Sequence, residues 1–374
     1  MLEIRMLPAR QGDAIWIKWG EKSLKYQMMV DMGTTEVGRK IQGRLKIANS
    51  EASKFELLVI SHVDGDHIGG VLPFLADEDS HINIDFKDIW FNGWVHLNGG
   101  QVPGPHSLTA GSSSAANDLE SFGPVQGELF SQWLGNRNWN KAFNAGPVCR
   151  APGSVLPKIK LAGDLYLTVL GPTPARLSKF KPKWKEEVQQ AIKKGTLGQV
   201  SPGLESFGST DPPTLETKKD LEILAQTVND NDNSEANGSS IIFLIEYQNH
   251  RILLAGDAFA DDIAEGLSLL GNGNKVRLDA FKIPHHGSKK NLTKEVVEQV
   301  ICKNWIISTD GTQFRHPDSE AIARILAYSS ESPVNLFFNV ESPFNKWWDN
   351  PDWQRKYRYS TVYGKDEDGI KIIF

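Results

Sequence analysis

The sequence predicts an α/β protein that forms one large domain. Short apolar runs rich in β-branched and aromatic residues recur along the 374-residue chain, and segments with helical periodicity lie between them. No Gly- or Pro-rich linker separates these elements into two independent groups. We therefore expect a single domain over residues 1–374, with two large insertions at approximately 93–152 and 172–238.

The first part of the chain is dominated by predicted strands. Each is an apolar run that ends in a polar or glycine-containing turn, which is typical of strands in a layered fold. The apolar run 57–60 ends in a polar loop, and the paired glycines Gly69 and Gly70 allow a helix to begin close by. The other elements expected here are strands at 2–7, 14–19, 26–30 and 89–92, and helices at 41–53 and 69–75.

The two insertions differ from the rest of the chain in composition. The first is rich in Gly, Ser, Pro, Asn and Trp, and it contains His96 and His106, which we interpret as surface histidines. The second is expected to begin with a charged helix at 184–194. Long loops in a compact domain usually form lids or substrate walls, or are disordered.

The second half of the chain repeats the alternation of strands and helices. A hairpin is expected from two apolar runs that flank a short polar turn. Its strands lie at 240–247 and 251–255, further strands are expected at 279–283, 305–308, 334–339, 359–363 and 370–374, and helices at 259–270, 293–300 and 319–328.

Composition restricts the class of protein. The formal net charge of −5 argues against a broad basic surface for duplex DNA. Cys149 and Cys302 are the only cysteines, which argues against a disulfide framework and favours a reducing compartment. No apolar run has the length of a signal peptide or a membrane span. We therefore expect a soluble, cytoplasmic protein with no membrane contact.

The loop after the run 57–60 concentrates potential metal ligands. It contains His62, Asp64, Asp66 and His67. Imidazole and carboxylate groups bind zinc, and manganese accepts more oxygen ligands. His62 and Asp64 would point the same way from an extended chain, whereas Asp66 and His67 would reach a second position. One loop could thus serve two metal ions; the alternative is a solvated polar turn.

Later strands also end in potential ligands. Asp257 follows a strand and a glycine, a place where a turn or helix-cap role is more common for an isolated aspartate. His285 and His286 follow the next strand. Because adjacent residues on a strand point to opposite sides, we expect one of these histidines to face the site and the other to support it.

Several residues near these motifs have open roles. Ser288 and Lys289 could contact an anion or could form a solvated basic turn. His316, a lone loop histidine, could donate a proton if it lies near a metal site. Asp13 and Asp31 also follow strands or turns, and for both we favour ordinary turn chemistry.

Taken together, the order of these motifs resembles that of the metallo-β-lactamase superfamily. More narrowly, it is similar to the metallo-β-lactamase-like domain of ComEC-type DNA-uptake proteins. The resemblance covers nearly all of the predicted core but not the region 93–152 or most of 172–238, and it implies a four-layer αββα sandwich. The motifs that carry it are His62-x-Asp-x-Asp-His67, Gly256-Asp257, His285-His286-Gly-Ser, the loop with His316-Pro317, Gln11-Gly-Asp-Ala14 and Asp31-Met-Gly33.

The resemblance implies a site for two metal ions, most simply zinc, with manganese as an alternative. Asp64 stands where the commonest superfamily pattern has a second histidine. The chain also has no histidine between His106 and His250, where that pattern supplies a further ligand; the ComEC-like branch shares both departures. By resemblance, His62 and Asp64 would bind the first ion, Asp66 and His67 the second, Asp257 would bridge them, and either His285 or His286 would complete the second.

The activity implied is metal-dependent hydrolysis, most simply of a phosphodiester in nucleic acid or a nucleotide. Asp66 or Asp64 would orient the attacking water, and His316 would protonate the leaving group. Ser288 and Lys289 would contact the phosphate. The mild net acidity favours a single strand, an RNA or a small nucleotide over long duplex DNA.

Other functions remain open from the sequence. The same fold could hydrolyse an ester, lactone or thioester, or the site could be degenerate and serve binding or regulation. The insertions could also dock a protein partner. Four tryptophans in the insertions could stack bases, although core packing is the favoured use of most of them: Trp94, Trp133, Trp139 and Trp184.

Overall fold

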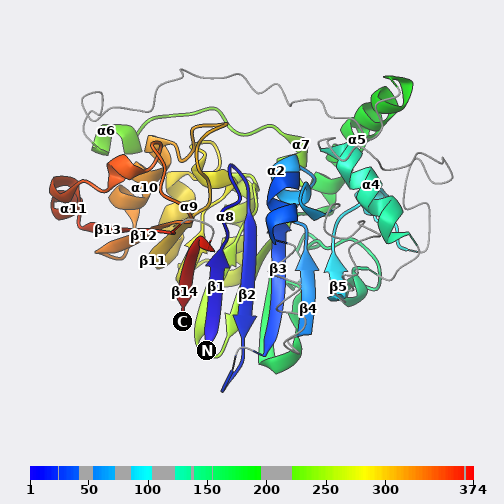
Figure 1. Ribbon diagram of the computed structural model, residues 1–374, viewed down its shortest axis with the longest axis horizontal. Coiled ribbons are helices and arrows are strands. Elements are labelled where there is room, and N and C mark those ends of the chain that lie inside the picture. Colours follow the sequence, from blue (N-terminus) through cyan, green and yellow to red (C-terminus); the bar gives the residue numbers. More distant parts are fainter. Residues whose placement is uncertain are drawn as a thin grey trace.

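The computed structural model is a mixed α/β protein with two mixed β-sheets, which confirms the predicted class at this level. It describes residues 1–23, 25–41, 54–71, 86–102, 123–135, 139–153, 155–194, 221–365 and 368–374. In Figure 1 the first sheet faces the viewer, with strands of the second sheet behind it and to its left.

The first sheet joins the two ends of the chain. Its strand order is β14-β1-β2-β3-β4-β5, with antiparallel pairing from β14 to β3 and parallel pairing from β3 to β5. β14 lies beside β1, so the N- and C-termini are close together (Figure 1). The strands are β1 Leu2–Met6, β2 Ala14–Trp19, β3 Tyr26–Met32, β4 Lys54–Val59, β5 Phe86–Trp90 and β14 Ile370–Ile373.

The second sheet has the order β13-β12-β11-β10-β9-β8-β7-β6. Strands β9 to β13 are parallel, and β6 to β9 are antiparallel neighbours, so the predicted β8–β9 hairpin is confirmed. The strands are β6 Lys158–Lys160, β7 Leu165–Gly171, β8 Ile242–Tyr247, β9 His250–Leu254, β10 Val276–Lys282, β11 Val300–Ile307, β12 Val334–Phe338 and β13 Tyr359–Tyr363.

An apolar core fills the space between the two sheets. Alternate residues of each strand point into it, such as Ile15 and Ile17 of β2 and Phe243 of β8. Their sequence neighbours Trp16 and Leu244 point to the opposite faces and are buried there in two further apolar clusters. Strands buried on both faces explain why the sequence shows continuous apolar runs.

Helices cover the outer faces of both sheets. α2, α4 and α5 pack on the first sheet, and α8, α9 and α10 pack on the second. Within the described residues, no helix is long and apolar enough to cross a membrane. The α-helices are α2 Gly65–Ile68, α4 Pro124–Leu134, α5 Pro174–Lys194, α6 Leu221–Ala225, α7 Glu235–Gly238, α8 Ala260–Gly271, α9 Lys294–Glu298, α10 Ser319–Tyr328 and α11 Pro351–Tyr357.

Short 3-10 turns supplement these helices. η1 opens the first insertion, and η5 contains the paired histidines of the second half of the chain. The turns are η1 Trp94–Asn98, η2 Lys141–Phe143, η3 Ala162–Asp164, η5 His285–Gly287 and η6 Lys346–Trp348.

One helix begins earlier than the sequence predicts, and one short helix is not predicted at all. α5 begins at Pro174 rather than at 184, because Leu177 and Phe180 in its first half are buried in the core of the first sheet. α2 covers Gly65–Ile68 and ends before the predicted helix 69–75, next to the end of β3. A Cβ atom at Gly70 would lie 2.1 Å from the Met32 carbonyl oxygen, so this close approach requires glycine. Residues 42–53 and 72–75 of the other predicted helical segments lie outside the described residues.

The described parts of the two insertions pack against each other on the first sheet. α4 from the first insertion contacts α5 from the second. Trp184 Nε1 donates a hydrogen bond to Glu128 Oε2 at 3.2 Å, and both side chains are fully buried. Trp139 is also fully buried, and Trp94 and Trp133 pack against the same core. The favoured core role of these tryptophans therefore agrees with the structure.

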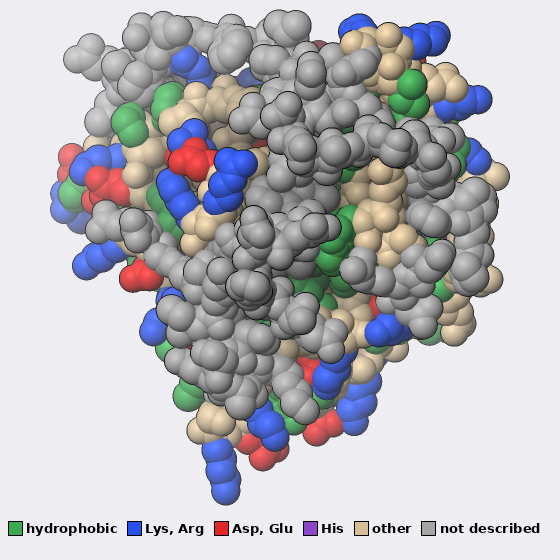
Figure 2. Space-filling model, turned by 45° about the vertical axis from the view of Figure 1, so that its right-hand side comes forward, with side chains coloured by type: hydrophobic (Ala, Val, Ile, Leu, Met, Phe, Trp, Pro, Cys, Tyr) green, Lys and Arg blue, Asp and Glu red, His purple; other side chains and the backbone are tan. Residues whose placement is uncertain are grey.

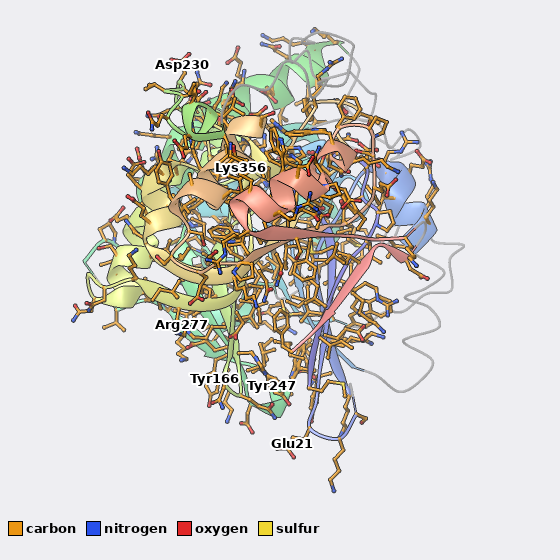
Figure 3. All side chains as sticks on the ribbon, turned by 90° about the vertical axis from the view of Figure 1, so that its left-hand side faces the viewer. Glu21, Tyr166, Asp230, Tyr247, Arg277 and Lys356 are labelled. Atoms are coloured by element: carbon orange, nitrogen blue, oxygen red, sulfur yellow. The ribbon has the colours of Figure 1, made fainter. Side chains whose placement is uncertain are left out.

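The polar motifs lie at one end of the sheets. Glu21, Tyr166 and Tyr247 lie at the lower end in Figure 3, whereas Asp230 lies at the upper end. β8 runs towards the lower end, where Tyr247 lies, and β9 is antiparallel to it, so the parallel strands β9, β10 and β11 all end at the upper end. In Figure 1, α2, which follows β4, lies in the upper part of the molecule as well. The carboxyl ends of parallel strands are where open sheets usually bind ligands.

Candidate metal centre

The carboxylate of Asp257 is the point on which four imidazole rings converge. Asp257 follows β9 and its side chain is buried. The histidines come from two loops far apart in the sequence, one after β4 and one after β10. His67 Nε2 lies 3.4 Å from Asp257 Oδ1, and Nε2 of His286, His285 and His62 lies 3.4, 3.7 and 4.0 Å from Asp257 Oδ2.

His67, Asp257 and His286, together with Asp13, offer ligand atoms that all lie within 4.8 Å of one another, and Asp66 lies beside this group. The Nε2 atoms of His67 and His286 are 3.2 Å apart, and His286 Nε2 lies 3.4 Å from Asp66 Oδ2. The ligand atoms of a tetrahedral zinc ion are separated by about 3.3 Å. These atoms are therefore spaced to bind one ion, and the geometry favours His286 over His285 for the second metal position.

The first metal position is less completely surrounded. His62 Nε2 and Asp64 Oδ2 lie 3.6 Å apart, so the two residues do approach each other as their spacing predicts. Among the described residues, His62 Nε2 and Asp257 Oδ1 are buried without a hydrogen-bond partner. Buried polar atoms normally have a hydrogen-bond partner, and these two have none. A bound metal ion would supply the missing partner for both atoms.

Asp31 holds two of the histidines in place. Its Oδ2 lies 2.8 Å from His67 Nδ1, and its two oxygens accept hydrogen bonds from Ser61 N and Ser61 Oγ at 2.7 and 2.6 Å. Ser61 Oγ in turn lies 3.0 Å from His62 Nδ1. A carboxylate on Nδ1 fixes the ring so that Nε2 faces the metal. The preference for ordinary turn chemistry at Asp31 was therefore wrong.

Asp13 has a comparable place beside His286. Its Oδ2 forms an ion pair with Lys282 Nζ, both side chains being 1% exposed, and its Oδ1 lies 3.5 Å from His286 Nδ1. Asp13 also lies near the ligand atoms of His67 and Asp257. Nδ1 of His286 lies closer to the Ser308 carbonyl oxygen, at 2.8 Å, and this contact orients the ring. Asp13 therefore lies within the closest group of ligand atoms but does not by itself fix His286. Turn chemistry alone does not describe this residue either.

Asp232 supports His285 from the second insertion. Its Oδ2 lies 3.3 Å from His285 Nδ1 and accepts hydrogen bonds from Asn237 Nδ2 and Asn291 Nδ2 at 2.8 and 2.9 Å. Sequence analysis missed both Asp232 and Lys282. The only signal for Asp232 was the density of Asp and Asn around it, and Lys282 is the last residue of a strand that also contains Arg277 and Asp279.

Both paired histidines reach the cluster, whereas the sequence predicts that only one of them faces the site and the other supports it. His285 and His286 have φ values of 46° and 54° and lie in the turn η5, not in an extended strand. The alternation of side chains that holds for a strand therefore does not apply to them.

The cluster strongly attracts positive charge. Burial opposes ionisation, but His67 and His286 lower the pKa of Asp66 to about 2. Burial also opposes the charged form of the histidines, but the Asp257 carboxylate raises the pKa of His67 and of His286 well above the ordinary value. Asp257 and Asp232 together raise the pKa of His285 to about 9. A divalent cation would supply the positive charge that this set of carboxylates favours.

A cleft with a volume of about 770 Å³ opens above Asp64 and Asp66. Its walls come from α5, the start of α4, the segment that leads into α7 and the loop after β11. Both insertions thus contribute to the walls, which is one of the uses expected of them.

His316 lies at the edge of the cluster. Its ring centroid is 5.4 Å from that of His285, and its side chain is 13% exposed. Its Nδ1 lies 3.7 Å from Asp318 Oδ1. The structure therefore places this histidine beside His285, and its proton-transfer role stays a prediction.

The structure does not bring Ser288 and Lys289 into the cleft. Ser288 is buried, and its Oγ accepts a hydrogen bond from Lys290 N at 3.3 Å. Lys289 Nζ lies 3.0 Å from Glu320 Oε1, and the residue lines a separate hollow. A phosphate contact by either residue stays a prediction that this geometry does not favour.

His96 is a buried structural residue, so its interpretation as a surface histidine was wrong. Gly93 N donates to its Nδ1 at 3.3 Å, its Nε2 lies 3.1 Å from the Ala145 carbonyl oxygen, and its ring packs edge-on against Trp139. Burial lowers the pKa of His96 to about 4. His106 lies outside the described residues.

No protein-family model matches the sequence of this chain, and no curated protein matches it at a significant level. A functional proposal therefore has to rest on the residues and geometry described above.

Proposed function

We propose that the protein is a metal-dependent phosphodiesterase of the metallo-β-lactamase superfamily, similar to the ComEC-type branch. The observation that carries the proposal is the convergence of four Nε2 atoms on the carboxylate of Asp257. Two facing sheets with helices on both outer faces agree with the αββα sandwich that the resemblance implies.

The residues present fit two divalent ions. Zinc suits the imidazole ligands, and manganese would tolerate the additional carboxylates. Such ions would supply a nucleophile at neutral pH and stabilise the charge that develops on the reacting ester oxygens. Asp66, His67, His286 and Asp257 would hold one ion; His62, Asp64 and Asp257, with His285 as a further available nitrogen, would hold the other.

The chain's own groups suit the remaining steps. Asp66 is 13% exposed and lines the cleft floor, so its carboxylate can both bind an ion and orient the attacking water. His316 can hold the proton that the leaving oxygen needs, and Asp318 Oδ1 lies 3.7 Å from its Nδ1. A phosphodiester suits this arrangement because two ions can stabilise its attacking and leaving oxygens together.

The proposal is tested by metal analysis and by turnover of bis-p-nitrophenyl phosphate. We expect about two metal ions per chain and, in the Asp66→Ala/His67→Ala variant, a loss of kcat/KM of at least about 100-fold. The matched control is His250→Ala/Asp279→Ala, which removes an Asp–His pair with a 3.9 Å separation at the start of β9 and in β10. This control should retain both metal and activity.

Two outcomes would contradict the proposal in different ways. Wild-type protein that carries no metal and is no more active than Asp66→Ala/His67→Ala would reject metal-dependent hydrolysis. Turnover of a lactone or thioester without turnover of any phosphodiester would instead favour an ester hydrolase on the same site.

A further inference from the structure

The walls of the cleft offer little positive charge to a nucleic acid. Among the described residues that line it, Lys183 is the one cationic side chain, and its Nζ lies 3.2 Å from Glu187 Oε1. Glu235 adds another carboxylate to the walls.

A nucleic acid strand brings a negative charge with every nucleotide. Proteins that bind single strands therefore line the path of the backbone with Lys and Arg. Ions held by Asp64 and Asp66 would neutralise the reacting phosphate, but phosphates on either side of it would meet the carboxylate of Glu235 and the Lys183–Glu187 pair, which offers no net positive charge. The described walls thus repel the flanking parts of a strand.

The described side chains on the face drawn in Figure 2 form no continuous basic track. The coloured Lys and Arg side chains lie there in separate groups, several of them beside acidic side chains. Within the described part of this face, a strand would find no extended row of cations.

The remaining polar groups of the cleft suit uncharged parts of a small substrate. Gln11, Asn233 and Gln313 present amides, which can both donate and accept hydrogen bonds. Phe314 is half-buried on the same lining and can contact a flat ring. The cleft volume of about 770 Å³ lies within the range usual for sites that enclose small molecules.

From these observations we infer that the substrate is a small molecule with a single phosphodiester between two uncharged organic groups, and not a nucleic acid strand. A dinucleoside monophosphate is the simplest compound of this chemistry. The inference rests on the proposed function, and it adds that Glu235 and the Lys183–Glu187 pair determine specificity by giving additional phosphates no net positive charge to bind.

The test compares a dinucleoside monophosphate with a long single-stranded oligonucleotide, as DNA and as RNA. With metal-replete full-length protein, we expect kcat/KM per scissile bond to be at least about tenfold higher for the dinucleoside monophosphate. Fluorescence anisotropy should detect no binding of the labelled oligonucleotide at physiological salt. In Glu187→Gln/Glu235→Gln, the ratio of oligonucleotide to dinucleoside turnover should rise by about tenfold, because repulsion is lost.

Glu186→Gln is the matched control, since Glu186 is an exposed neighbour on α5 that does not line the cleft. It should leave the ratio unchanged. Efficient cleavage of the oligonucleotide, with kcat/KM falling steeply as salt rises, would overturn this inference but leave the phosphodiesterase proposal intact. If no diester of either size is cleaved, the proposed function fails and the inference fails with it.

Discussion

Lys282 and Asp13 form an ion pair with both side chains only 1% exposed. Removing two charges from water costs several kcal/mol per ion, so such pairs add little net stability. Their arrangement has another consequence, because Asp13 Oδ1 lies 3.5 Å from Nδ1 of His286, a residue of the candidate metal centre. The pair therefore lies directly beside a candidate ligand, and each partner becomes costly to remove alone.

We expect Lys282→Met to lower the free energy of unfolding by about 3–5 kcal/mol, because Asp13 would be left buried without its counterion. The double variant Asp13→Asn/Lys282→Met should lose less, since no unpaired charge remains. Urea denaturation in the presence of a chelator measures both values. Lys289→Met, at the partly exposed pair with Glu320, should change stability by no more than about 1 kcal/mol. Additive losses in the double-mutant cycle would show that the pair is not coupled.

At the scale of elements, the η1 turn depends on a neutral histidine. His96 accepts a hydrogen bond at Nδ1 from Gly93 N and can donate one from Nε2 to the Ala145 carbonyl oxygen. Both ring nitrogens thus have a hydrogen-bond partner when the ring is neutral. Protonation of Nδ1 would break the hydrogen bond from Gly93 N, because two N–H groups would then face each other. This agrees with the effect of burial, which lowers the pKa of His96 from 6.5 to about 4.

The stability of the protein should therefore fall as the pH drops from about 6.5 to 4. In this range the unfolded chain binds a proton at residue 96 that the folded chain does not, and at pH 5 this lowers the free energy of unfolding by about 2 kcal/mol. His96→Gln should lack this contribution when wild type and variant are compared by urea denaturation at pH 7 and pH 5. His250→Gln controls for the loss of one imidazole. An unchanged pH dependence in His96→Gln would contradict the prediction.

At the scale of the whole molecule, the candidate centre connects the two sheets. His62 and His67 follow β4 of the first sheet, whereas Asp257 and His286 follow β9 and β10 of the second. An ion bound among them would add a link that the unfolded chain lacks. Metal binding is therefore expected to stabilise the folded state as a whole and not only the loops that hold the ligands.

We expect chelation to lower the melting temperature and added zinc or manganese to restore it. At a free ion concentration of about 100 times Kd, one site contributes about 2.7 kcal/mol to the free energy of unfolding. Differential scanning calorimetry measures the change. Asp257→Asn should respond weakly to metal, while Asp279→Asn, at a half-exposed carboxylate in β10, should respond like the wild type. Equal melting temperatures with and without metal would exclude preferential binding to the folded state.

Local patterns predicted many elements closely. The bounds expected for β2, α10 and β13 coincide with the structure, because each is a compact apolar pattern between polar residues. Local sequence patterns did not predict the conformation where contacts between distant segments determine it. The first half of α5 is helical because it buries Leu177 and Phe180 on the first sheet, and η5 adopts positive φ angles at a strand end.

The sequence by itself determined the α/β class and the residue types of the candidate centre, because strand runs and dense His and Asp motifs are local features. Only the tertiary structure decided which atoms meet. The convergence on Asp257, the choice of His286 for the closest set, and the supporting roles of Asp13, Asp31, Asp232 and Lys282 all depend on contacts between distant segments. No local pattern encodes such contacts, since they arise when the two sheets bring their strand ends together.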